Sequence, residues 1–189
     1  MYKIVTVKDT VRIPPNRFQE ELESVITQEL EVMTAGRIEK EIGILLAVTK
    51  INKLSEGRII LGDGAVYYDI EFNVLAYQPR INEVVEGFVS EATEFGVFVS
   101  FGPVDGLIHI SQITEDFMSY DQKNAQFVGK ESNKLLKIDD ALRARIVTVS
   151  LKSRTYDSKI GLTMRQPYLG KLEWLEDEKK SEKEKEEAS

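Results

Sequence analysis

Aromatic side chains and the only histidine of the chain lie close together in residues 95–111, which read FGVFVSFGPVDGLIHIS. Phe95 and Phe98 fall in one predicted strand, and His109 falls in the next. Exposed rings of this kind stack on nucleobases, and each stacked base contributes about 1–3 kcal/mol to binding. The alternative is a structural role, in which the phenylalanines fill a core and His109 forms a hydrogen bond within a turn. The residue pattern alone favours neither interpretation.

Strand alternation limits where the two phenylalanines can point. Successive side chains of a strand face opposite sides, which groups Phe95 with Val97 and Val99 and leaves Phe98 on the other side. A bulge at the intervening glycine would change this phase. With strict alternation, one of the two rings therefore lies outside the core.

Basic residues are concentrated in residues 141–171, although the chain as a whole has a net charge of −7. This stretch has a single acidic residue, Asp157. Acidic residues prevail in residues 1–79 and 176–189, but carboxylates beyond a Debye length of about 8–10 Å are largely screened. The stretch can therefore attract phosphates, and a solvated strand face explains its charge equally well. Its basic residues are Arg143, Arg145, Lys152, Arg154, Lys159, Arg165 and Lys171.

The residues needed for catalysis or for a cofactor are scarce. The chain has one histidine, no cysteine and no glycine-rich phosphate loop, and the adjacent carboxylates Asp139 and Asp140 would point apart in an extended segment. We therefore expect no enzyme activity, no catalytic residue, no metal site and no cofactor. The longest apolar run, ILLAV at residues 44–48, is too short to span a bilayer, so we expect a soluble cytoplasmic protein without a membrane partner.

The elements of the first 80 residues predict an α+β domain. An alternating strand near the amino terminus ends at Pro14 and Pro15, and an amphipathic helix is expected over Arg17–Thr34. The expected apolar stripe of this helix comprises Phe18, Leu22, Val25, Ile26, Leu30 and Met33. Two strand-like segments follow, and Pro79 closes the unit, so we place a domain at residues 1–80.

A short apolar turn separates two strands of this domain. Ile60 and Leu61 precede Gly62, Asp63 and Gly64, and the two glycines allow positive φ angles at an exposed end. We call these five residues the docking tip, because an exposed apolar turn can insert into a partner protein. An ordinary hairpin turn is the more common explanation of such a pattern.

The remainder of the chain predicts a small barrel. Five short strands are expected between residues 81 and 175, with a long insertion after the third that could hold a helical turn or loose structure. A five-stranded barrel of this type is an OB-fold, which binds oligonucleotides on its second and third strands. The charged tail, residues 176–189, has little to bury and is expected to be a frayed helix or disordered.

The segment EGFVSEATEFGVFVSFGPVDGLIHIS resembles the first three strands of the RNA-binding OB repeat first described in the large ribosomal protein of the bacterial small subunit. The segment ARIVTVSLKSRTYDSKIGLTMR is similar to its last two strands. The RNA-facing positions of that repeat fall here on Phe95, Phe98, His109, Ser150 and Lys159. Ser150 stands where the family usually has Asp, so it is not included among the predicted RNA-binding residues.

Nearly the whole chain resembles the archaeal RNA polymerase subunits called E-prime. The resemblance rests on the strand, the PP turn, the acidic helix, EGRIILGDGAVYYDIEF, the OB repeat with its insertion and the ending KIGLTMRQPYLGKLEWL. It implies a truncated RNP-like domain that docks on the polymerase core, and a heterodimer with the small helical RNA polymerase subunit called F. It further implies contact with nascent single-stranded RNA near the exit channel, a role in promoter opening, and initiation factors as further partners.

The resemblance turns both patterns into site predictions. The predicted RNA-binding residues are Phe95, Phe98, His109, Arg143, Arg145, Lys152, Arg154 and Lys159. The predicted polymerase-docking residues are Ile60, Leu61, Gly62, Asp63 and Gly64. An OB-fold factor of translation initiation or RNA decay, and a purely structural assembly protein, are the alternative functions.

Overall fold

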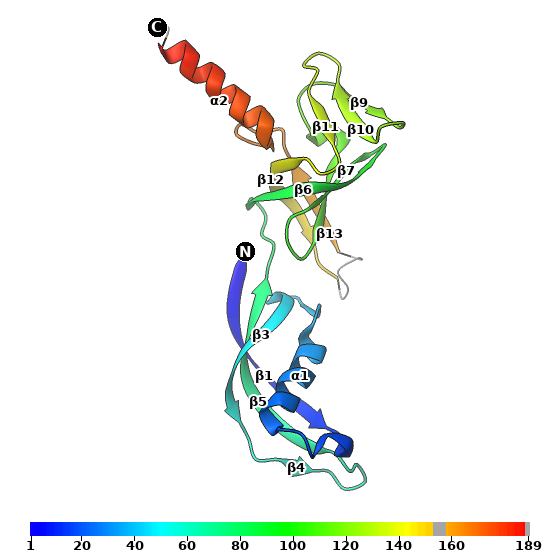
Figure 1. Ribbon diagram of the computed structural model, residues 1–189, viewed down its shortest axis with the longest axis vertical. Helices are drawn as coiled ribbons and strands as arrows, with labels where there is room; N and C mark the ends of the chain where they lie inside the picture. Colours follow the sequence, from blue (N-terminus) through cyan, green and yellow to red (C-terminus); the bar gives the residue numbers. More distant parts are fainter. Residues whose placement is uncertain (153–157, 188–189) are drawn as a thin grey trace. The chain divides into compact units, whose positions relative to one another are not determined.

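The computed structural model describes residues 1–152 and 158–187, with side chains described up to residue 180 (Figure 1). The chain folds into two compact units. The first comprises Met1–Gln78 with Leu151 and Lys152, and the second comprises the other described residues from Pro79 onward.

The first unit is a twisted antiparallel sheet with one helix. Its elements are β1 (Tyr2–Ile13), the 3-10 turn η1 (Pro15–Arg17), α1 (Leu22–Thr34), β2 (Ile38–Glu39), β3 (Gly43–Leu54), β4 (Arg58–Ile59) and β5 (Val66–Tyr77). The long strand β5 is central, because β1 and β3 pair with its two edges and β4 extends the ladder near its start.

Helix α1 covers one face of this sheet (Figure 1). Val25, Ile26 and Leu30 of the helix are buried against alternate residues of the strands, among them Phe72 and Val74 of β5. The sequence pattern requires this arrangement, since the helix has one apolar stripe and each strand has one apolar face.

Helix α1 begins later than the sequence predicts. A helix was expected over Arg17–Thr34, whereas α1 starts only at Leu22. Proline suits the start of the 3-10 turn η1, and Arg17 at its end is tied by an ion pair of 2.8 Å to Glu29 on the helix. The first residue of the predicted stripe, Phe18, consequently remains half exposed.

The second unit is a barrel with an inserted sheet and a final helix. Its elements are β6 (Val84–Thr93), β7 (Gly96–Ser100), β8 (Asp105–His109), the 3-10 turn η2 (Ile110–Gln112), β9 (Met118–Asp121), β10 (Gln126–Gly129), β11 (Leu135–Lys137), β12 (Ala141–Ser150), β13 (Lys159–Thr163), β14 (Gly170–Lys171) and α2 (Leu172–Glu187). The sheet order is β13-β8-β7-β6-β12-β14, and β12 also pairs with β13, which closes the barrel. The predicted fold class, an α+β domain followed by a five-stranded barrel with an insertion, is confirmed.

The insertion forms a small sheet of its own. Strands β9, β10 and β11 pair antiparallel, where the sequence predicts a helical turn or loose structure. Phe127 is fully buried, and its ring lies 5.2 Å from that of Tyr120 on the neighbouring strand. Strands of three or four residues are too short to show a clear alternation of apolar and polar residues. The sequence pattern therefore does not reveal β9, β10 and β11.

Helix α2 includes most of the charged tail. The described helix runs to Glu187, so this part of the tail is helical, which is one of the two expected forms. The first turns of α2 pack against the barrel through the buried Leu175. Opposite charges three residues apart, such as Asp177 and Lys180 at 3.7 Å, lie on the exposed side of the helix. None of the described helices is long and apolar enough to cross a membrane.

A buried ion cluster attaches this helix to the barrel. The ammonium of Lys171 lies 3.0 Å from Asp140 and 2.7 Å from Glu173, and both Lys171 and Asp140 are buried. Burial by itself favours the uncharged amine, but the hydrogen bonds to Glu173 and Asp140 outweigh it and raise the pKa of Lys171. Lys171 therefore has a structural role, although it belongs to the basic stretch of the sequence.

Candidate nucleic-acid interface

The barrel presents two phenylalanines on its outer side. Phe98 points outward from β7 between the buried Val97 and Val99, and Leu107 lies opposite it on β8. Phe95 lies in the turn before β7, 45% exposed, and its ring meets that of Phe98 edge to face at 6.1 Å. Strict alternation predicts that Phe95 points to the same side as the buried valines. Phe95 precedes the strand, however, so the alternation does not apply to it.

His109 is aligned with the phenylalanines by a close approach of two strands. It lies opposite Gly96 in the β7–β8 ladder. A Cβ atom at position 96 would collide with the carbonyl oxygen of Ile108, so only glycine allows this spacing. Phe95, Phe98 and His109 together form what we call the aromatic face.

The histidine ring is oriented by the turn that follows it. The backbone N–H of Ser111 donates to Nδ1 of His109 at 3.3 Å, and the Ser111 hydroxyl lies 2.9 Å from the same nitrogen. With Nδ1 accepting, the neutral ring carries its proton on Nε2 and can donate from there. The exposed ring can therefore both stack and donate a hydrogen bond.

The predicted basic residues are distributed unevenly around the aromatic face. Lys159 is exposed, but the parallel pairing of Gly161 with Leu107 puts it level with Asp105, four residues or about 13 Å along β8 from His109. Arg145 is opposite Thr163 on β13, which puts it at the His109 end of the barrel. Its Nε is buried and has no hydrogen-bond partner within the described part of the chain.

Arg143 lies away from the aromatic face. It is opposite Glu86 on β6 and pairs with that carboxylate at 2.8 Å. Phe98 is opposite Glu91 of the same strand, five residues or about 17 Å further along. Lys152 is exposed. Arg154 lies outside the described residues.

Arg165 belongs at the face although the site prediction omits it. Its Nη1 donates to the carbonyl oxygen of Ser111 at 3.4 Å, beside the hydroxyl that contacts His109. It is exposed and forms no ion pair with any residue that the structure describes. The sequence signal was its place in the basic stretch, and the pairing of β13 with β8 supplies the position.

The docking tip is the most exposed apolar part of the first unit. Ile60 is 53% exposed and Leu61 is fully exposed, and Ile59 at the end of β4 adds to the same patch. Gly62 has a φ of 94°, which favours glycine, with open space around it. Gly64 has no positive φ, so of the two glycines that allow such a conformation only Gly62 adopts it.

Asp63 fixes the tip to the sheet. Its carboxylate accepts two hydrogen bonds from Arg12, at 2.7 and 2.9 Å, and one from the hydroxyl of Tyr67 at 2.6 Å. The hydrogen bonds from Arg12, and to a smaller extent from Tyr67, hold the pKa of Asp63 well below its usual range. Asp63 therefore orients the tip, and the side chains of Ile60 and Leu61 are exposed.

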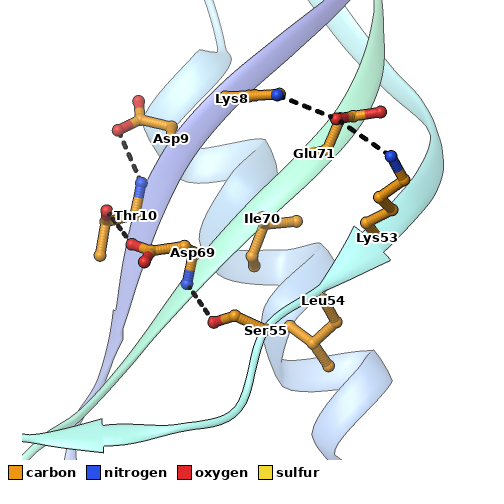
Figure 2. A pocket seen from close by; sticks show the side chains of 9 residues that line it. All are labelled: Lys8, Asp9, Thr10, Lys53, Leu54, Ser55, Asp69, Ile70 and Glu71. Atoms are coloured by element: carbon orange, nitrogen blue, oxygen red, sulfur yellow. Dashed lines mark hydrogen bonds and ion pairs between the residues drawn. The ribbon is translucent and has the colours of Figure 1, made fainter.

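A hollow of about 640 Å³ lies on the sheet of the first unit (Figure 2). Glu71 pairs with Lys8 at 3.4 Å and with Lys53 at 3.8 Å, and Asp69 pairs with Arg58 at 2.7 Å. These charged groups thus neutralise one another, which makes the hollow a poor site for a charged ligand.

The two units match two known domain families. Residues 8–64 match the SHS2 domain found in the N terminus of Rpb7p/Rpc25p/MJ0397, and residues 78–157 match the S1 RNA binding domain. This combination defines a class of RNA polymerase subunits with an SHS2 domain followed by an OB-type domain.

The polymerase subunits among the relatives agree with this class over most of the chain. The chain is 43% identical to DNA-directed RNA polymerase subunit Rpo7 of Saccharolobus shibatae, over 95% of this chain and 100% of the relative. It is 26% identical to DNA-directed RNA polymerase III subunit RPC8 of Bos taurus, over 79% of this chain and 76% of the relative. Ribonuclease R of Vibrio cholerae is 32% identical over 47% of this chain but only 11% of its own length. The chain therefore belongs to the Rpo7 family of RNA polymerase subunits, which confirms the resemblance to E-prime and a role in transcription.

Proposed function

We propose that the chain is a non-catalytic stalk subunit of a multisubunit RNA polymerase. It docks on the polymerase core through the docking tip and forms a heterodimer with the small helical subunit that the E-prime resemblance implies. The aromatic face binds nascent single-stranded RNA near the exit channel. The assembled stalk assists promoter opening, with initiation factors as further partners.

The observation that supports this proposal most is the separation of two exposed surfaces. The docking tip lies on the first unit and the aromatic face on the second, and each unit has its own buried core. An apolar tip without phosphate-binding cations suits a protein partner. Exposed aromatic rings with Arg165 close to His109 suit single-stranded RNA.

Recovery of the tagged chain from its native host tests this assignment. The core polymerase subunits and one small helical subunit should accompany it, and the core should be lost when Leu61 carries a charge. Copurification with ribosomes or with an exonuclease, and without polymerase, would instead support the translation or RNA-decay alternative.

A further inference from the structure

The aromatic face continues into a second hollow on the barrel unit. Ser111 connects the two, since its side chain contacts His109 and its carbonyl oxygen accepts from Arg165. Arg165 lines a hollow of about 360 Å³, together with Tyr168 and Trp174. The hollow thus begins where the aromatic face ends.

Apart from Arg165 and the exposed Glu115, the acidic and basic groups that line this hollow are paired within the described part of the chain. Asp116 accepts from the backbone and the hydroxyl of Ser132 at 3.0 and 2.8 Å, and Lys134 pairs with Glu178 at 3.0 Å. Lys134 also lies over the ring of Trp174, 5.2 Å from its centroid. The interior therefore suits a neutral planar group better than a phosphate, and the positive charge available for a phosphate is that of Arg165 at the edge.

Tyr168 is held in an unfavourable conformation for its residue type. Its φ is 65° and its side chain is 72% exposed. The other described non-glycine residues with positive φ are small: three are Asn or Asp, which tolerate it, and one is Ala125. A bulky ring in this conformation is strained. Strain of this kind is concentrated at functional sites, and here it presents an aromatic ring to solvent at the hollow.

We propose that this hollow binds one further nucleotide of single-stranded RNA, with the base against Tyr168 and the adjoining phosphate at Arg165. The strand would leave the aromatic face past His109 to reach it. This inference rests on the RNA-binding role proposed above. RNA is favoured over a protein partner because the hollow is continuous with the aromatic face and has a cation at its edge.

Binding of labelled uridine oligomers to the full chain tests the proposal. Oligomers of about 4 and about 12 nucleotides span the range of OB-fold site sizes. Tyr168→Gly should weaken the longer oligomer about fivefold or more, the lower limit of base stacking, and the shorter one about twofold or less. Because glycine accepts the positive φ, the thermal unfolding midpoint should be unchanged or higher.

Two further variants separate this proposal from the general RNA-binding role. Phe98→Ala should weaken both oligomers, whereas Phe88→Ala, an exposed phenylalanine between Glu86 and Glu91, should weaken neither. Arg165→Gln should flatten the log–log salt dependence of the longer oligomer by about 0.7.

Three results would overturn the proposal. If Tyr168→Gly binds the longer oligomer like the parent while Phe98→Ala does not, the hollow is no RNA site and the aromatic face remains one. If neither variant changes binding, the RNA-binding role fails as well. If Tyr168→Gly keeps RNA binding but loses the small helical polymerase subunit, the hollow is a protein interface.

Discussion

The docking tip and the aromatic face are both exposed, but different contacts hold them in place. The tip is a turn fixed by one polar cluster around Asp63 and one positive φ at Gly62. The aromatic face consists of side chains whose strand neighbours, such as Val97 and Ile108, are fully buried. The tip can therefore be altered without disturbing its unit, whereas the face depends on the packing of the barrel.

A charge at the tip should give the largest effect. Leu61→Asp would place a carboxylate in an apolar contact and remove the burial of a leucine, itself about 1.5–3 kcal/mol. We expect attachment to core polymerase to weaken about 100-fold or more in a pull-down titration. Stability should not change, since Leu61 is fully exposed in the isolated chain.

The matched control is Val32→Asp, which puts the same charge on the exposed side of α1. It should bind polymerase like the parent. Equal losses in both variants would mean that net charge, and not the tip, determines attachment.

A methyl group between β7 and β8 should affect the barrel next most strongly. Gly96→Ala would press against the carbonyl of Ile108, and overpacking of this kind costs about 1–3 kcal/mol. We expect the free energy of unfolding of the second unit and RNA affinity to fall together, with polymerase attachment kept. Denaturant unfolding measures the free energy of unfolding, and an RNA titration measures the affinity. If the barrel is destabilised but RNA affinity is unchanged, the aromatic face does not depend on the packing of the barrel.

The two glycines of the tip should behave differently. Gly62→Val forces a β-branched residue to a φ of 94°, which costs about 1–2 kcal/mol, and the turn should distort. Gly64→Val has no such strain and would meet only the Pro15 side chain at 3.4 Å. Polymerase attachment should weaken for the first variant and hardly for the second, and the reverse order would show that the turn geometry is irrelevant.

The smallest expected effect concerns the salt dependence of RNA binding. Lys159→Gln should flatten the log–log slope by about 0.7 if its ammonium contacts one phosphate. Arg143→Gln should leave the slope unchanged, because Arg143 is paired with Glu86 away from the aromatic face. Titrations across a salt series compare the two, and equal slopes for both variants would contradict this division.

The sequence is sufficient to predict the two units and their main strands, because alternation and helical spacing report which residues face a core, but it does not predict the small sheet of β9, β10 and β11. It is not sufficient for Phe95, since a two-residue turn removes it from the strand phase that its neighbours follow. The count of basic residues is likewise incomplete. Arg143, Lys171 and Arg165 look alike in the sequence, but strand pairing gives them an ion pair, a buried cluster and an exposed position, respectively.

The buried Lys171 cluster has a consequence for the behaviour of α2 on heating. Hydration of charged groups becomes less favourable as temperature rises, so the cost of keeping Lys171 and Asp140 out of water decreases. The apolar contribution of Leu175 to the same attachment levels off over that range. The contribution of the ion cluster to holding the helix on the barrel, relative to that of apolar burial, therefore grows with temperature.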